Sequence, residues 1–572
     1  MPLDPETLQP DACYLALKAR DARFDGCFFT GVTSTGIYCR PVCRVRTPRR
    51  ENCRFFPHAA QAERAGFRPC LRCRPELAPD AQAWSMQDAA SILARQAARM
   101  LDEPEAWGDD TPSVELLAAR LGVSERHLRR IFEAQFGVSP LQYLQTRRLL
   151  TAKQLLADTA LPVTQVALAS GFGSLRRFNA AFAQHYGLSP SRLRREGAGP
   201  AGQGMVVRLG YRPPYDTGAM LAFFRQRAIV GLEHVAAEGP GTLARTLELH
   251  AGGRRHGGWI EAGFDEERHQ FVLRVSESLH EALPQVIRRA RAAFDLDCDP
   301  LAVNGVLQES FPGCEGLRVP GAFGGWELAV RAVLGQQITV AAARTLAQRV
   351  VERFGAPIET PHAALHRLFP TPEALAQAEG DALGSLGIVR QRQAAIVALA
   401  RAVQAGTLQL HAGADVGPTV EALKSLPGIG DWTAQYIAMR ALRWPDAFPS
   451  GDVALQKALG VQQARLPARE AEAASQAWKP WRSYAVIRAW ARLAPGAVPA
   501  PHANPASSPV VPASPSVIPA MAGIQGSRLR ETEEEALGPR LRGDDGPAPR
   551  LRGDDGPSPR LRANVGRPRN PS

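Results

Sequence analysis

Four cysteines stand in two close pairs near the start of the chain. Cys39 and Cys43 lie in the segment TGIYCRPVC, and Cys70 and Cys73 lie in RPCLRC, with 26 residues between the two pairs. Two such pairs can converge on one zinc ion, which favours tetrahedral coordination and thiolate ligands. The spacing therefore predicts a metal site. It leaves open whether the metal is purely structural or whether one of the sulfurs also reacts.

The sequence around these cysteines is RFDGCFFTGVTSTGIYCRPVCRVR, followed by AGFRPCLRCRPE. Over residues 20–76 it resembles the N-terminal zinc domain of the Ada family, which repairs methyl phosphotriesters in DNA. The resemblance implies one zinc ion held by Cys39, Cys43, Cys70 and Cys73, with Cys39 also the methyl acceptor. The other cysteines of this region lack the pairing and are expected to be buried thiols: Cys13, Cys27 and Cys53.

A metal-bound cysteine sulfur can attack a methyl group, because coordination keeps the sulfur deprotonated while leaving it a lone pair. A phosphotriester is uncharged, so an anionic cluster can approach it. Four thiolates on Zn(II) carry two net negative charges, and methylation of one sulfur leaves a single charge. Repulsion from the DNA then falls, and binding strengthens in a salt-dependent manner. The nearby arginines are expected to contact phosphates, or alternatively to form a solvated surface: Arg40, Arg44, Arg46, Arg68 and Arg72.

Residues 114–140 and 166–190 share one pattern. Each gives a helix, a glycine turn and a second helix that begins after a serine N-cap, Ser124 or Ser174. Two such units joined by a long helix resemble the DNA-binding domain of the AraC family. The second helix of each unit is expected to enter the major groove of promoter DNA with these side chains: Arg126, His127, Arg129, Arg130, Arg176 and Arg177. Apolar positions at helical spacing are expected to form the core: Leu128, Ile131, Phe132, Phe178 and Phe182.

The segment LPGIGDWTAQYIAMRAL, residues 426–442, resembles a helix-hairpin-helix. Gly428 and Gly430 would let backbone N–H groups approach a DNA phosphate at a helix N-terminus. Asp452, in FPSGDVALQKAL, stands where the related DNA glycosylases carry their catalytic aspartate. Three further segments, LGYRPPYDTGAMLAFFRQRAIVGLE, FGGWELAVRAVLGQQITVAAARTLA and WKPWRSYAVIRAW, extend the likeness. Together they resemble the AlkA family of 3-methyladenine DNA glycosylases.

The resemblance to AlkA implies hydrolysis of the bond between an alkylated base and its sugar. Asp452 would stabilise the cationic sugar and orient water. Trp432, Tyr436 and Trp490 would line the base pocket, where electron-rich rings attract a cationic base; a helix core is the alternative for any one ring. No lysine stands between Gly428 and Asp452, which favours base excision without strand cleavage.

Two further features of this region follow from the same resemblance. Gln337, in the segment LGQQITV, stands where AlkA inserts an apolar wedge into the base stack, so a polar wedge is expected here. The hairpin is also a candidate site for a monovalent cation held by backbone carbonyls. Cys298 and Cys314 follow no ligand pattern and are expected to be structural.

The composition agrees with a nucleic-acid partner. The 572 residues include 68 Lys and Arg against 56 Asp and Glu, for a net charge of +12, which suits double-stranded DNA. Transcription activation would add RNA polymerase as a partner. The chain opens without a hydrophobic signal segment and has no apolar run long enough for a bilayer, so we expect a cytoplasmic location at the bacterial nucleoid and no membrane partner.

The predicted fold class is multidomain. We expect a small α+β zinc domain, an all-α double helix-turn-helix domain, and an α+β domain followed by an all-α helix-hairpin-helix glycosylase domain. The C-terminal segment is rich in Pro, Ala and Ser and then repeats PRLRGDDGP, so it is expected to be a disordered tail. The predicted boundaries are 1–80, 85–196, 205–290, 291–494 and 499–572.

These features together favour a protein that senses and repairs DNA alkylation. One alternative is a regulator only, in which the zinc domain senses, the helices bind promoters and the glycosylase half is inactive. A second alternative makes the cysteines structural and the chain a glycosylase on a DNA-binding scaffold. The sequence contains no second cysteine motif of the PCHR type, so repair of O6-methylguanine is not expected.

Overall fold

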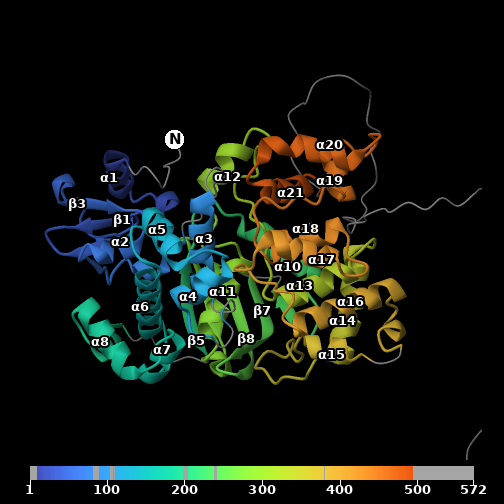
Figure 1. The fold of residues 1–572 in the computed structure, drawn as a ribbon, viewed down its shortest axis with the longest axis horizontal. Helices are drawn as coiled ribbons and strands as arrows, with labels where there is room; N and C mark the ends of the chain where they lie inside the picture. The colour runs from blue at the N-terminus through green and yellow to red at the C-terminus, as the bar shows by residue number, and fades with distance from the viewer. Residues whose placement is uncertain are drawn as a thin grey trace, which may run out of the picture. The chain divides into compact units, whose positions relative to one another are not determined.

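The computed structural model describes residues 9–80, 89–103, 107, 110–197, 204–236, 241–378 and 381–493. They belong to one compact unit of the chain, drawn as a coloured ribbon in Figure 1. The predicted tail lies outside the described residues, and so does most of the glycine-rich segment before residue 205. In the described part of the chain, no helix is long and apolar enough to cross a membrane.

The first module, residues 9–80 and here called the zinc domain, is a four-stranded sheet in the order β3-β1-β2-β4. β2 and β4 run parallel, whereas β1 pairs antiparallel with both β2 and β3. Phe29, Tyr38, Phe56 and Phe67 are buried together and form the core of this α+β module. Its elements are α1 (Pro10–Ala19), β1 (Phe29–Val32), β2 (Ile37–Cys39), β3 (Cys53–Phe56), α2 (Ala59–Arg64) and β4 (Arg68–Pro69).

The second module is entirely helical. Ser124 and Ser174 cap their helices as predicted, since each side chain accepts a hydrogen bond from a backbone N–H of the first turn. Gly137 and Gly187 end the same helices in the left-handed conformation. The five apolar side chains that were expected in the core are buried. The helices are α3 (Ala89–Asp102), α4 (Val114–Arg120), α5 (Glu125–Phe136), α6 (Pro140–Asp158), α7 (Val163–Ala169), α8 (Leu175–Tyr186) and α9 (Pro190–Gly197).

The third module is a five-stranded antiparallel sheet in the order β5-β9-β8-β7-β6, with α10 and α11 packed against it. The same core continues into the second helix-turn-helix unit, where Phe178 and Phe182 join Val207 and Leu273. The elements are β5 (Met205–Gly210), α10 (Thr217–Arg227), β6 (Glu233–Val235), β7 (Thr242–Ala251), β8 (Arg254–Asp265), β9 (Gln270–Val275) and α11 (Leu283–Ala293).

The fourth module is a helical bundle around a large apolar core, to which Ile229 and Leu232 of the preceding module also contribute. With the third module it forms the segment 204–493, here called the glycosylase half. α17 and α18 form the expected hairpin pair (Figure 1). The helices are α12 (Pro300–Leu307), α13 (Gly325–Leu334), α14 (Val340–Phe354), α15 (Pro372–Ala376), α16 (Arg390–Gln404), α17 (Val416–Lys424), α18 (Asp431–Arg440), α19 (Val453–Ala458), α20 (Pro467–Ala474) and α21 (Arg482–Ala491).

Candidate metal centre and base pocket

Strand pairing brings the two cysteine pairs together. β2 ends at Cys39, and its parallel partner β4 runs directly into Cys70. The sulfur atoms of Cys39, Cys43, Cys70 and Cys73 all lie within 4.8 Å of one another. Thiolates about 2.3 Å from a tetrahedral zinc ion lie roughly 3.8 Å apart. The four side chains thus have the composition and the spacing of a structural zinc site.

The protonation of the cluster also fits a bound cation. A hydrogen bond with Cys43 raises the pKa of the Cys39 thiol, and a hydrogen bond with Cys39 lowers the pKa of the Cys70 thiol. Neighbouring sulfurs therefore share protons, because charging one makes it harder to charge the next. A dication that accepts all four sulfurs removes this conflict, since metal ligation requires the thiolate form.

Arg40 follows the candidate methyl acceptor and has a structural role. Its side chain is 7% exposed, and its Nε donates a 2.8 Å hydrogen bond to Oδ1 of Asp25. Its Nη1 donates to the carbonyl of Cys73 at 3.0 Å, and its backbone N–H donates to the Cys73 sulfur at 3.4 Å. The expectation that Arg40 contacts a phosphate is therefore wrong, because its guanidinium is buried inside the protein.

The other arginines near the cluster reach the surface. Arg44, Arg46 and Arg72 are exposed, as phosphate contacts must be. Arg68 is also exposed, although its Nη1 donates to the carbonyl of Tyr186 at the end of α8 and so joins the zinc domain to the second helix-turn-helix unit.

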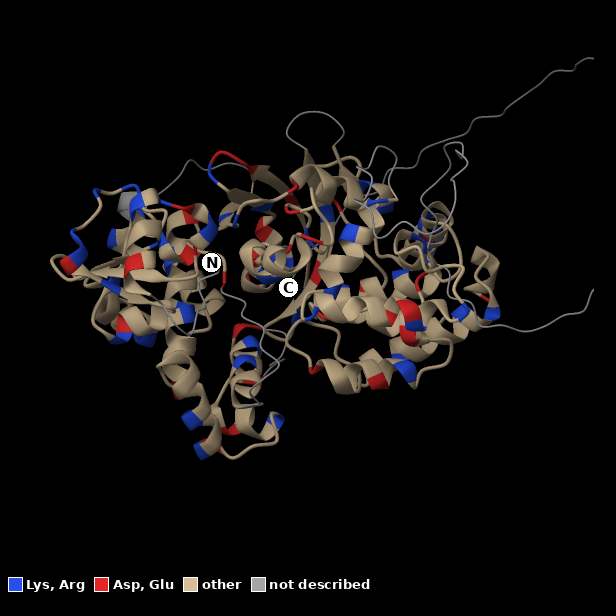
Figure 2. Ribbon diagram, turned by 90° about the horizontal axis from the view of Figure 1, so that it is seen from above, with Lys and Arg blue, Asp and Glu red and all other residues tan. Residues whose placement is uncertain are grey.

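The predicted recognition helices, which are the second helices of the two helix-turn-helix units (α5 and α8), present their arginines to solvent. Arg126, Arg129 and Arg130 of α5 are exposed, and so are Arg176 and Arg177 of α8. Arg129 forms an ion pair with Glu125 at 2.8 Å and Arg130 contacts His127, so part of the α5 charge is balanced locally. Lys and Arg are spread over many elements in Figure 2 and are not gathered on one helix.

Asp452 is the N-cap of α19 and is completely buried. Its Oδ1 accepts hydrogen bonds from the backbone N–H of Leu455 at 2.7 Å and from the indole Nε1 of Trp490 at 3.1 Å. Its Oδ2 accepts from the indole Nε1 of Trp432 at 3.0 Å. Burial raises the pKa of Asp452, and these hydrogen bonds act in the opposite direction because they favour the ionised form.

Trp432 and Tyr436, one turn apart on α18, stack with ring centroids 5.3 Å apart and an interplanar angle of 11°. They border a cavity of about 110 Å³. The cavity wall also contains Phe223 of α10 and two arginines that the sequence did not single out, Arg227 and Arg440. Phe223 belongs to one of the segments that resemble AlkA, and this resemblance was the only sequence signal that could have pointed to it as a pocket residue.

The two arginines hold the wall of this cavity in place. Arg440 donates to the carbonyls of Pro320 and Gly321 at 2.8 and 2.9 Å, and also to the hydroxyl of Tyr436. The guanidinium of Arg227 lies 3.7 Å from the ring centroid of Phe223. Burial lowers the pKa of Arg227 to about 10, so it remains a cation at neutral pH.

The hairpin and the wedge position lie next to each other. Gly428 adopts φ +75° in the hairpin turn, and its carbonyl accepts a 2.9 Å hydrogen bond from the Gln336 amide. Gly430 follows as the N-cap of α18. Gln337 lies between α13 and α14, is exposed and has φ +54°, a left-handed conformation unusual for a residue with a side chain. The monovalent cation at the hairpin stays a prediction.

Four family profiles match the chain in succession. They are "Metal binding domain of Ada" over residues 12–76, "Helix-turn-helix domain" over 117–196, "AlkA N-terminal domain" over 206–324 and "HhH-GPD superfamily base excision DNA repair protein" over 330–483. A Mycobacterium tuberculosis protein named "Probable bifunctional transcriptional activator/DNA repair enzyme AlkA" is 37% identical over 497 residues, covering 84% of this chain and 96% of the relative. The chain belongs to this bifunctional Ada–AlkA family.

Membership of the Ada–AlkA family confirms the resemblances found in the sequence and the multidomain fold class. Each part also has a shorter relative. "DNA-3-methyladenine glycosylase 2" of Escherichia coli is 36% identical over 287 residues, covering 50% of this chain and 96% of that protein. "Bifunctional transcriptional activator/DNA repair enzyme AdaA" of Bacillus subtilis is 32% identical over 186 residues, covering 32% of this chain and 82% of that protein.

Proposed function

We propose that this protein repairs alkylated DNA in two ways and regulates transcription in response to the damage. The zinc domain accepts a methyl group from a DNA phosphotriester, the helix-turn-helix units bind promoter DNA, and the glycosylase half excises alkylated bases of the 3-methyladenine type. The observation that carries the proposal is the combination, in one chain, of four adjacent cysteine sulfurs and a buried aspartate held by two indoles.

For the first activity, Cys39, Cys43, Cys70 and Cys73 would hold one zinc ion, which keeps the sulfurs deprotonated at neutral pH. The Cys39 sulfur attacks the methyl carbon of the phosphotriester. A sulfur–carbon bond forms while the carbon–oxygen bond breaks, and the electron pair stays on the phosphate oxygen. The products are S-methylcysteine and an ordinary phosphodiester. Nothing restores the sulfur, so one chain repairs one lesion.

Methylation at Cys39 would also strengthen DNA binding. The cluster loses one negative charge, so its repulsion from the phosphate backbone decreases. The exposed arginines of the zinc domain and of the recognition helices are the proposed DNA contacts: Arg46, Arg68, Arg126, Arg129, Arg130, Arg176 and Arg177. Bound at a promoter, the protein would act on RNA polymerase. These steps together would convert a lesion into a transcriptional response at the bacterial nucleoid.

For the second activity, the damaged nucleotide is extruded from the duplex and its base enters the cavity beside Trp432 and Tyr436. Gly428 and Gly430 of the hairpin would hold the DNA backbone, and Gln337 would fill the vacated stack. Asp452 then stabilises positive charge on the sugar as the base leaves. A water molecule completes the hydrolysis.

The deciding experiment incubates the purified chain with methylated DNA and measures two products. Mass spectrometry should find a methyl group on Cys39, and chromatography should find free 3-methyladenine. If methyl transfer occurs without base release, the chain is a regulator only. If base release occurs without methyl transfer, the cysteines are structural and the chain is a glycosylase on a DNA-binding scaffold.

A further inference from the structure

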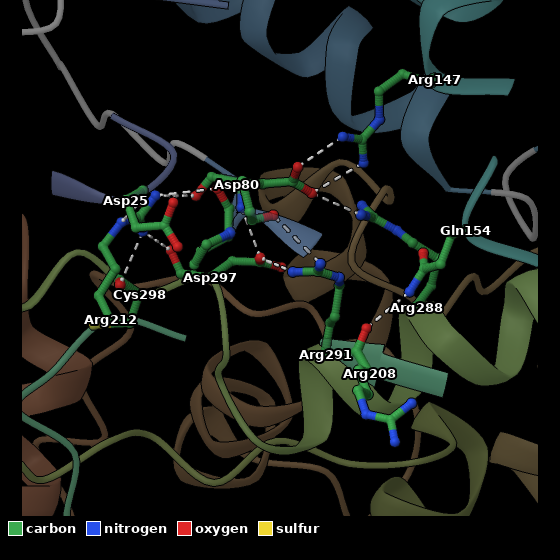
Figure 3. Close-up of polar contacts among 12 residues, drawn as sticks. Asp25, Asp80, Arg147, Gln154, Arg208, Arg212, Arg288, Arg291, Asp297 and Cys298 are labelled. Carbon is green, nitrogen blue, oxygen red and sulfur yellow. Dashed lines mark hydrogen bonds and ion pairs between the residues drawn. The ribbon is translucent and has the colours of Figure 1, made fainter. Parts of the chain in front are cut away.

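Arg212, which follows β5 in the glycosylase half, is fully buried, yet none of its hydrogen-bond acceptors is a carboxylate. Its guanidinium donates instead to five backbone carbonyls (Figure 3). The distances are 2.6 Å to Asp25, 3.2 Å to Pro79, 3.0 Å to Asp80, 2.9 Å to Asp297 and 3.1 Å to Cys298. The first three acceptors belong to the zinc domain. The zinc domain therefore supplies most of the partners that a buried arginine requires.

Ion pairs surround this contact. The backbone N–H of Asp80 donates to Oδ1 of Asp297 at 2.8 Å, and Arg291 of α11 pairs with the same carboxylate at 2.5 Å. The Asp80 carboxylate pairs with Arg147 of α6 at 2.7 Å and with Arg288 of α11 at 3.0 Å (Figure 3). One aspartate of the zinc domain thus joins the helix-turn-helix module to the glycosylase half.

The backbones at this contact touch directly. A Cβ atom added to Gly210, the last residue of β5, would lie 2.5 Å from the carbonyl oxygen of Leu77 and 3.1 Å from Nη2 of Arg40. Both neighbours belong to the zinc domain. The backbone conformation of Gly210 would accept a residue with a side chain. Glycine is therefore required at this position by the close approach of the zinc domain.

Three contacts connect the interface between the zinc domain and the glycosylase half with Cys39, the candidate methyl acceptor. Arg40 follows Cys39 in sequence and binds the carbonyl of Cys73, so it lies against both cysteine pairs. Its guanidinium also binds the carboxylate of Asp25. The carbonyl of Asp25 then accepts the hydrogen bond from Arg212. The position of Asp25, one of the five acceptors of Arg212, is therefore linked to the order of the cysteines.

We propose that metal binding at the four cysteines and docking of the glycosylase half are energetically coupled through Arg40, Asp25 and Arg212. Zinc on the cysteines stabilises the docked state, and docking in turn strengthens zinc binding, because coupling between two equilibria is reciprocal. This inference rests on the proposed zinc site. It adds that metal binding in the zinc domain and docking of the glycosylase half affect each other.

The test uses the intact chain and the variant Gly210→Ala, with Gly305→Ala as the matched control. A Cβ at position 305, in α12, meets no atom within 4 Å. Zinc content is measured first, and the zinc affinity is then determined by equilibrium competition with a chromogenic chelator. Gly210→Ala should bind zinc at least roughly fivefold more weakly, the lower end of typical coupling, and Gly305→Ala should match the unmodified protein. Hydrogen exchange over residues 205–216 should also increase in Gly210→Ala.

A second measurement needs no variant. Removal of zinc from the unmodified protein should increase hydrogen exchange over residues 205–216. The peptide 431–440, whose Trp432 and Arg440 side chains form hydrogen bonds within the glycosylase half, should be unaffected. Unchanged exchange over 205–216 would overturn the coupling, and so would an unchanged zinc affinity in a Gly210→Ala protein whose exchange has increased. Unchanged exchange in Gly210→Ala would refute the docking role of Gly210. A protein purified without zinc would refute the metal site and, with it, the coupling.

Discussion

The indole N–H of Trp490 donates a 3.1 Å hydrogen bond to the carboxylate of Asp452, 38 residues earlier in the chain. The indole of Trp432 binds the other carboxylate oxygen at 3.0 Å. Two aromatic side chains thus orient one buried acid and favour its ionised form without adding a positive charge. A cation that develops nearby therefore meets an anion already fixed in position, which is the arrangement that electrostatic stabilisation of a transition state requires.

Replacing Asp452 by Asn should strongly reduce the rate of base release. The amide keeps the size of the side chain but removes the negative charge, and we expect excision of 3-methyladenine to fall about 100-fold or more. The measurement is the single-turnover rate on methylated DNA. Asp381→Asn is the control, because Asp381 is an exposed acid of the same half. Methyl transfer to Cys39 should be unchanged in both variants, and base release at the normal rate in Asp452→Asn would disprove the assignment.

The pH dependence of excision should reveal the two indole hydrogen bonds. Because burial raises the pKa of Asp452, activity should be lost on acidification at a pH above 3.8, the ordinary value for aspartate. Trp490→Phe removes one donor that favours the charged form, so the pKa should rise further and the acid limb of kcat/KM should move to higher pH. Trp326→Phe also removes an indole donor, but one directed at the carbonyl of Pro370, and it should leave the acid limb in place.

The cysteine cluster can be tested one sulfur at a time. Cys39→Ser should end methyl uptake, from one methyl group per chain to none, because serine lacks the nucleophilic sulfur. Cys39→Ser and Cys43→Ser should both lower the zinc content, since three sulfurs hold the metal less tightly than four. With zinc in excess, only Cys43→Ser should still accept a methyl group. Cys53→Ser is the control: Cys53 lies outside the cluster and its sulfur is directed at the carbonyl of Arg49. Metal analysis and intact mass of the three variants would show whether the sulfurs have different roles.

Much of the architecture could be predicted because it depends on local patterns. The serine caps at 124 and 174 and the buried Phe132 and Phe182 follow from helix chemistry and helical spacing alone. The pairing of β2 with β4, which joins the cysteines, fits the spacing of the two cysteine pairs.

The roles of the buried arginines could not be predicted in this way. Arg40 and Arg212 have the residue type of a solvated surface, and their burial depends on carbonyls supplied by segments far away in the sequence. The same applies to Arg227 and Arg440 beside the base cavity. Arginine carries no local sign of which acceptors it will meet, so these roles required the structure.

The same substitution should therefore have different effects at Arg40 and Arg46, six residues apart: a loss of stability at Arg40 and a change in DNA binding at Arg46. Arg40→Gln leaves the buried carboxylate of Asp25 without its partner, which should cost about 3–5 kcal/mol of stability. Arg46 is exposed, so Arg46→Gln should change the stability by less than about 0.5 kcal/mol. It should instead reduce the slope of log affinity for DNA against log salt by about one phosphate contact. Thermal unfolding and DNA binding at several salt concentrations measure both quantities. A reduced salt slope with normal stability in Arg40→Gln would show that Arg40 contacts DNA after all.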